Sequence, residues 1–280
     1  MAYKTLLVQI DETKANAGRL QAAVDLARAH EAHVTGLYVI REPELPGFVT
    51  AQLPRDAIDA QRAGAEEAAR AATGAFLAKA DREGIKADAR IARAPVHEVA
   101  ALFARHARYA DLVVAGQADP DEPGPGGRHM VEDLVLSAGR PVLVIPYIGA
   151  AKPVGRIVTV AWDAGREAAR AVADAMPLLE AAKQVHVVMV NPESGDDGHG
   201  AEPGADIALS LARHGVDTEA HAISGTDLEE GDAILSWLSD SGSDLLVMGL
   251  YGHARFRELV LGGVSRRILE SMTVPVLMAR

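Results

Sequence analysis

Short aliphatic runs alternate with amphipathic, alanine-rich segments along the whole chain. The aliphatic runs, such as 4–10 and 111–116, are typical of strands that are buried on both faces. The alanine-rich segments, such as 14–30, repeat their apolar positions at helical spacing. Strands are therefore expected at 4–10, 33–40, 86–92, 111–116, 141–145, 156–162, 184–190, 217–223, 244–249 and 274–278. Helices are expected at 14–30, 55–83, 95–107, 129–138, 165–182, 202–214, 229–240 and 256–271.

The same order of landmarks occurs twice. Residues 4–11 form an aliphatic run that ends in Asp, and residues 156–163 repeat it. The alternation of strands and helices within each half favours a parallel sheet with right-handed crossovers. The sequence thus predicts an α/β fold of two tandem doubly wound parallel five-stranded sheets with helices on both faces. The predicted domains are 1–148 and 154–280.

The two halves differ in length at one place. The offset between matching residues is 152 at the first strand and 133 at the fourth, so the first half has about 19 extra residues. These lie between Arg41 and Ala110, and we expect them in the entry loop and second helix, 43–84.

Composition excludes several classes of function. The net charge of −11 argues against nucleic acid or an anionic membrane as a partner, because both require clustered Lys and Arg. The chain has no cysteine, which removes disulfides, thiolate catalysis and Cys-ligated zinc and fits a reducing cytoplasm. No signal-peptide pattern and no apolar run of about 20 residues is present, so a cytoplasmic location is expected. The ten histidines suggest no metal set, and His186 and His221 are interpreted as partnered or edge residues of strands.

A glycine-rich segment follows the fourth strand of the second half. It has the spacing Gly-x2-Gly-x9-Gly-Gly-Val-Ser, formed by Gly249, Gly252, Gly262, Gly263, Val264 and Ser265. Glycine lets the backbone turn sharply and approach a ligand closely, and the start of the following helix favours phosphate. Because ligands of doubly wound sheets bind at the carboxyl ends of the strands, this segment is a candidate phosphate loop. His253 lies inside it and could face phosphate or simply be solvated.

With these motifs the chain resembles the universal stress protein family over its whole length, as a tandem pair. The ATP-binding branch of that family has Gly-x2-Gly-x9-Gly followed by a small hydroxyl residue, whereas this chain has Gly263 there and Ser265 two positions later. The resemblance implies ATP or another adenine nucleotide as the ligand, with or without Mg²⁺. It also implies that Asp163 faces the ribose or the adenine edge and that the Val190 backbone contacts adenine. Asp163 is equally interpreted as a helix cap.

The first half lacks this loop. Gly116 is followed by a stretch rich in acidic residues and proline, 117–127, which would repel phosphate and remove donors. Asp11 is retained, but as a helix cap. We therefore expect the first half to bind no nucleotide in the standard pose.

Two functions of different classes remain open. One is a cytoplasmic stress-response protein that binds an adenine nucleotide in its second domain as a sensor or regulator. The alternative is a nucleotide-free interaction scaffold. The sequence has no Walker A lysine, nucleophile elbow or identifiable base, so no catalytic residue is assigned and any hydrolysis should be slow. The resemblance further implies pairing of the two domains about a pseudo-two-fold axis through 141–145 and 274–278, and leaves homodimerisation open.

Overall fold

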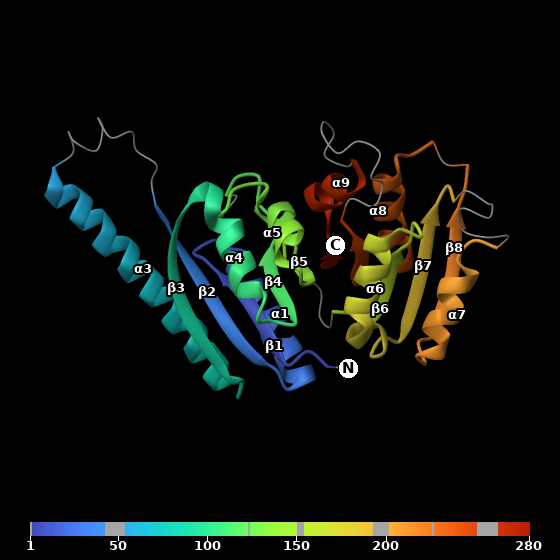
Figure 1. Ribbon diagram of the computed structural model, residues 1–280, viewed down its shortest axis with the longest axis horizontal. Coiled ribbons are helices and arrows are strands. Elements are labelled where there is room, and N and C mark those ends of the chain that lie inside the picture. Colours follow the sequence, from blue (N-terminus) through green and yellow to red (C-terminus); the bar gives the residue numbers. More distant parts are fainter. Residues whose placement is uncertain are drawn as a thin grey trace. The chain divides into compact units, whose positions relative to one another are not determined.

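The chain folds into two compact units. The computed structural model describes residues 2–42, 54–122, 124–149, 154–192, 202–225, 227–250 and 263–280. The first unit comprises Tyr3–Ala138, and the second is formed mainly by Gly139–Arg280. Figure 1 shows the helices and strands of each unit.

The first unit is built on a parallel sheet. Its strands are β1 (Thr5–Ile10), β2 (His33–Glu42), β3 (Ala87–Pro95) and β4 (Leu112–Gly116). They lie in the order β3-β2-β1-β4, and each neighbouring pair is parallel. The chain moves outward from β1 to β3 and then returns to the other side of β1, so the direction of winding switches between β1 and β4. Ligands of such sheets bind at the carboxyl ends of the strands beside this switch.

The second unit repeats this arrangement. Its strands are β5 (Val142–Ile145), β6 (Ile157–Ala161), β7 (Gln184–Val190), β8 (Thr218–Ile223), β9 (Leu245–Gly249) and β10 (Val276–Ala279). They lie in the order β5-β10-β9-β6-β7-β8. The switch of winding falls between β6 and β9, which are parallel neighbours.

One strand of the first repeat is part of the second unit. β5 pairs with β10 in antiparallel register, with Val144 opposite Val276 and Leu143 opposite Leu277. This pairing satisfies backbone groups along β10 that an edge strand would leave unpaired. The expected approach of 141–145 to 274–278 is therefore confirmed.

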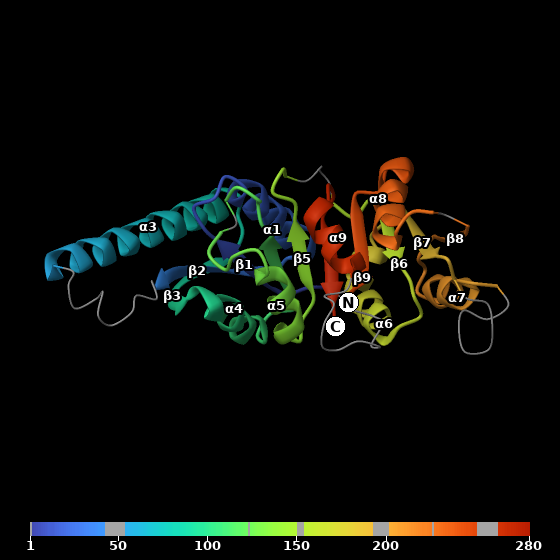
Figure 2. The ribbon, with the colours of Figure 1, turned by 90° about the horizontal axis from the view of Figure 1, so that it is seen from above.

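Helices cover both faces of each sheet. The helices are α1 (Asn16–His30), α3 (Arg55–Arg82), α4 (Val99–Ala107), α5 (Met130–Ala138), α6 (Arg166–Leu179), α7 (Ala205–Arg213), α8 (Glu230–Ser241) and α9 (Gly263–Ser271). In the first unit, α1 and α3 pack on one face and α4 and α5 on the other (Figure 2). In the second unit, α6 and α7 cover one face and α8 and α9 the other. The predicted fold class is confirmed. No helix of the described ranges combines the length and apolar character that crossing a bilayer requires.

Most of the extra residues of the first half are accounted for by one long helix. α3 has 28 residues, whereas α7 of the second unit has 9. The side chains of α3 that are buried, from Ala69 to Ala80, lie in its second half, and its first turns are exposed. The insertion predicted for 43–84 is thus found in α3, and 43–53 lie outside the described residues. The helix predicted at 256–271 is described from Gly263 onward.

Candidate functional site

The carboxyl ends of β6, β7 and β9 meet at one edge of the second sheet, because these strands are parallel. Asp163 lies two residues beyond β6, and its Oδ1 accepts a hydrogen bond of 2.8 Å from the Gly165 backbone N–H. Gly165 is the residue before α6, so Asp163 fixes the entry of the chain into that helix. Asp163 thus forms the turn before α6, but its interpretation as a helix cap is wrong, because Gly165 is the N-cap and no side-chain hydrogen bond caps this helix.

Two residues at the same edge have left-handed backbone conformations. Ala164 follows Asp163 with φ 57°, and Asn191 follows Val190 with φ 45°. Such conformations cost free energy for residues with a side chain and concentrate at binding sites. Val190 is the last residue of β7, and the Asn191 N–H donates to the Ile223 carbonyl at 2.7 Å. The predicted adenine-contacting position thus lies at a sharply turned strand end.

Gly249 ends β9 where the sheet meets the start of α6. A Cβ added there would lie 2.6 Å from both the Ala168 N and the Glu167 carbonyl carbon. Glycine is therefore required at this position by close packing of the backbone, whatever ligand the edge holds. This role was not apparent from the spacing of the glycines.

The other end of the glycine-rich segment opens α9. Gly263, Val264 and Ser265 form its first turn. A Cβ added to Gly263 would meet no atom of the described residues within 4 Å, whereas Ser265 is buried. Packing among the described residues therefore does not require glycine at this position. Gly252, His253 and Gly262 lie outside the described residues.

In the first unit an arginine fills the equivalent edge. Arg19 of α1 is 2% exposed, and its guanidinium lies against Gly116, the last residue of β4. Its Nε donates to the Gln9 carbonyl at 2.8 Å, and its Nη2 lies 2.7 Å from Asp11 Oδ2 and 3.0 Å from Asn16 Oδ1. Burial lowers the pKa of Arg19, while Asp11 raises it, and an arginine remains charged throughout. A buried cation thus lies where the chain turns from sheet to helix.

Gln9 and Asp11 complete this buried network. The Gln9 side chain donates to Asp11 Oδ2 at 2.9 Å and accepts from the Gly116 N–H at 3.1 Å. Asp11 Oδ1 also accepts from the Thr13 N–H at 3.0 Å, which matches the turn that Asp163 makes in the second unit. Asp11 is therefore the counter-ion of Arg19, and the prediction that it caps the helix is wrong, because Ala15 is the N-cap of α1 and no side-chain hydrogen bond caps that helix.

Sequence reasoning missed this ion pair. A lone Arg in the apolar pattern of 17–29 and a Gln in an aliphatic strand were the available signals. Buried charges occur in proteins mainly as pairs, so Arg19 pointed to a partner. Spacing alone does not identify that partner, which lies across the turn from strand to helix.

The acidic loop covers the network from outside. A Cβ added to Gly124 would lie 3.9 Å from Asp11 Oδ2 and from the Thr13 methyl group. The cavity that remains has a volume of about 20 Å³ and is lined by residues that include Asp11, Arg19 and Met130. That volume suits one or two water molecules and is far too small for a nucleotide.

The second unit differs at these positions. Asp163 lies 152 positions after Asp11, and the same offset places Ala161, Ala168 and Ala171 where the first half has Gln9, Asn16 and Arg19. The atoms closest to Gly249 are correspondingly backbone and Cβ atoms of α6 instead of a guanidinium. Three of the four polar side chains of the first edge therefore have alanine counterparts at the second, and Asp11 has its counterpart in Asp163.

Comparison with known proteins identifies the family to which this chain belongs. The model of the universal stress protein family matches residues 2–146 and again 155–280. A curated relative, universal stress protein Slr1230 of Synechocystis sp., is 41% identical over 49 residues, which are 18% of this chain and 17% of that relative. The match to this relative therefore spans only a small part of its length.

Solved structures show the same fold over the full chain. A universal stress protein from Archaeoglobus fulgidus DSM 4304 has a TM-score of 0.72 at 18% identity, covering 99% of this chain and 96% of that one. The protein PA1789 from Pseudomonas aeruginosa PAO1, described as functionally unknown, has a TM-score of 0.59 at 16% identity, with 99% and 92% covered. With the two matched segments, this chain belongs to the universal stress protein family as a tandem two-domain member.

Proposed function

We propose that the chain is a regulatory stress-response protein that binds ATP or another adenine nucleotide at the carboxyl edge of the second unit. The family membership supports the stress-response role. The ligand and its place are supported by the glycine spacing and by the strand ends that carry Asp163 and Val190. The site would hold the nucleotide with or without Mg²⁺ and would hydrolyse it slowly or not at all.

The observation that carries this proposal is the difference between the two edges. In the first unit, Arg19 and its partners occupy the edge with a network of their own. In the second unit the counterparts of Gln9, Asn16 and Arg19 are alanines, so no cation lies at the position of Arg19, whereas Asp11 has its counterpart in Asp163. A phosphate group there would be bound by backbone N–H groups at the start of α9, where the helix dipole favours negative charge.

Gly263→Asp tests the site without disturbing the fold. A Cβ at this position meets no atom of the described residues within 4 Å, and an aspartate in the first turn of a helix is favourable, so the variant should fold normally. Its carboxylate should repel phosphate and weaken nucleotide binding at least tenfold. Gly64→Asp, at an exposed position of α3 with equally open surroundings, adds the same charge elsewhere and serves as the control.

Two measurements report the outcome. Purified protein is denatured and its supernatant analysed for carried-over nucleotide by mass spectrometry, and the native protein is melted with and without ATP–Mg²⁺. ATP at 100 times its Kd stabilises a protein by about 2.7 kcal/mol, which is readily seen in melting. Wild type and Gly64→Asp should show this shift, and Gly263→Asp should not. Absence of carried-over nucleotide and of any shift at millimolar ATP in wild type would reject nucleotide binding and favour the scaffold alternative.

A further inference from the structure

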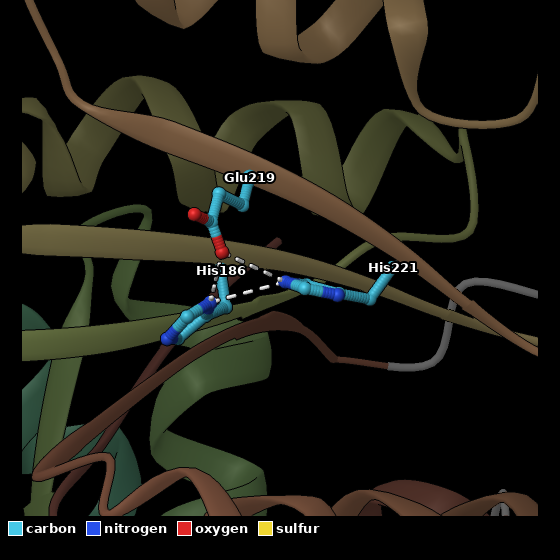
Figure 3. Close-up of side chains that lie close together, drawn as sticks. All are labelled: His186, Glu219 and His221. Carbon is cyan, nitrogen blue, oxygen red and sulfur yellow. Dashed lines mark hydrogen bonds and ion pairs between the residues drawn. The ribbon is translucent and has the colours of Figure 1, made fainter.

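Three potential metal ligands converge on the outer strands of the second sheet. His186 lies on β7, and Glu219 and His221 lie on β8. His186 is the register partner of Glu219, and Val188 is the partner of His221, so all three side chains project from the same face. Figure 3 shows them pointing toward one another. The interpretation of His186 and His221 as partnered strand residues is confirmed, and with Glu219 they form a group of three that the sequence did not predict.

The separations of the three donor atoms match a metal ion. His186 Nδ1 lies 3.2 Å from His221 Nε2. Glu219 Oε2 lies 3.9 Å from His186 Nδ1 and 3.6 Å from His221 Nε2. The point that is equally far from these three atoms lies about 2.1 Å from each of them. This distance is within the usual range of Zn–N and Zn–O bonds, about 2.0–2.2 Å. We infer that His186, Glu219 and His221 bind a divalent first-row transition ion such as Zn²⁺, at a site separate from the proposed nucleotide edge.

The surroundings hold the imidazoles in place. The ring of Trp237, from α8, lies 5.6 Å from the ring of His186 and 4.6 Å from that of His221. Trp237 is itself anchored, because its Nε1 donates to Thr159 Oγ1 at 3.2 Å. Ligands that are already ordered lose little conformational freedom when an ion binds.

The two rings are joined by a hydrogen bond between His186 Nδ1 and His221 Nε2, the two nitrogens that would hold the ion. A neutral imidazole offers a lone pair, which is the form that coordinates metal. The hydrogen bond that joins the two rings uses one N–H, and on coordination that proton moves to the opposite nitrogen of its ring.

One side of the cluster faces solvent. The side chain of His186 is 10% exposed, that of His221 31% and that of Glu219 58%. An ion can therefore enter from the Glu219 side. Three protein ligands with one open side leave room for a water molecule as the fourth ligand, which is a common arrangement for zinc.

In the first unit, the matching positions on β2 and β3 hold a carboxylate that is paired with an arginine. Thr35 and Asp88 are register partners on β2 and β3, as His186 and Glu219 are on β7 and β8. Two residues after Asp88 comes Arg90, whose Nε lies 3.4 Å from Asp88 Oδ2, while Thr35 Oγ1 donates to Asp88 Oδ1 at 2.8 Å. In the second unit the place of Arg90 is taken by His221, so the carboxylate there has an imidazole pair instead of a permanent cation.

Zinc titration of the full chain tests the inference. Calorimetry on chelator-treated protein at neutral pH should show one Zn²⁺ bound per chain. Glu219→Gln and His221→Gln each remove a direct ligand and should weaken binding by at least the roughly 10- to 100-fold that loss of an outer-shell partner costs. Glu219 is mostly exposed, so its variant should fold, and melting in the absence of zinc checks this. The control is His33→Gln, which removes a histidine that contacts a single carboxylate, Asp88.

The fluorescence of Trp237 provides a second measure of metal binding, which would not respond if His186, Glu219 and His221 had only a structural role. The chain has two tryptophans, so Trp162→Phe leaves Trp237 as the only indole. Ni²⁺, a paramagnetic ion that quenches nearby indoles, should quench this fluorescence in a saturable way, and His221→Gln should abolish the saturable component. The inference is overturned if wild type binds no Zn²⁺ at submillimolar concentration. It is equally overturned if Glu219→Gln and His221→Gln bind Zn²⁺ as tightly as His33→Gln. Neither result depends on whether the second unit binds a nucleotide.

Discussion

At the scale of single residues, Arg19 is the centre of a buried polar network at the carboxyl edge of the first unit. Its guanidinium is buried and bonded to Gln9, Asp11 and Asn16. A buried charge is tolerated only when it is paired and hydrogen-bonded, so the four residues depend on one another. The network fills the strand edge where ligands of this class of sheet bind, so we expect it to exclude a ligand from the first unit.

Removal of Arg19 should strongly destabilise the protein. Arg19→Met leaves Asp11 buried without its counter-ion, and the loss of one partner of a buried pair costs about 3–5 kcal/mol. Urea unfolding monitored by circular dichroism measures the change in the free energy of unfolding. Arg28→Met, which removes an exposed ion pair with Glu83, should cost less than about 1 kcal/mol. Similar losses in the two variants would show that the buried network contributes no more than a surface pair.

At the scale of secondary structure, the pairing of β5 with β10 ties the end of the first repeat to the second unit. Both strands are fully buried and aliphatic, and they are antiparallel in a sheet whose other described pairs within the unit are parallel. The antiparallel ladder covers the free edge of β10 and adds cross-strand side-chain contacts. The strand order therefore makes Leu143 and Leu277 direct neighbours.

A double-mutant cycle measures this pairing. Leu143→Ala and Leu277→Ala should each cost about 2–5 kcal/mol of unfolding free energy, because both side chains are fully buried. Since they are register partners, the double variant should depart from additivity by about 0.5–3 kcal/mol. The control cycle combines Leu143→Ala with Val185→Ala, whose effects on the unfolding free energy should add. Val185 lies on β7, which is four strands from β5, at about 19 Å. Additive effects for Leu143 and Leu277 would contradict the register.

At the scale of the whole molecule, the two units share a fold and differ at their carboxyl edges. The first has an internal ion pair under an acidic loop, with room for about one or two waters, whereas the second keeps the aspartate as Asp163 but has Ala171 at the position of Arg19. A duplicated fold whose two edges have diverged in this way should respond to a nucleotide in one unit only.

Hydrogen exchange with mass spectrometry tests this asymmetry. Addition of ATP–Mg²⁺ should slow exchange in peptides that cover the end of β6, the end of β9 and the start of α9, because a bound ligand suppresses local opening. Peptides that cover the ends of β1 and β4 should keep their rates within about twofold. Protection of both units to the same extent would show that Arg19 and its partners do not exclude the ligand.

Much of this architecture follows from the sequence alone. Aliphatic runs buried on both faces and alanine-rich amphipathic segments have distinct periods, so the described strands and helices lie close to their predicted positions. The repeat was visible because the same landmarks recur at a nearly constant offset. The glycine spacing and the family match were likewise properties of the linear chain.

Tertiary structure alone decided which side chains meet. Arg19 reaches Asp11 across the turn from strand to helix, and Gly249 is required because the α6 backbone packs against it. His186 and His221 are 35 residues apart and come within 3.2 Å because β7 and β8 pair in one particular register. Local periodicity specifies elements, whereas register and packing depend on contacts between distant residues, which a single sequence does not reveal.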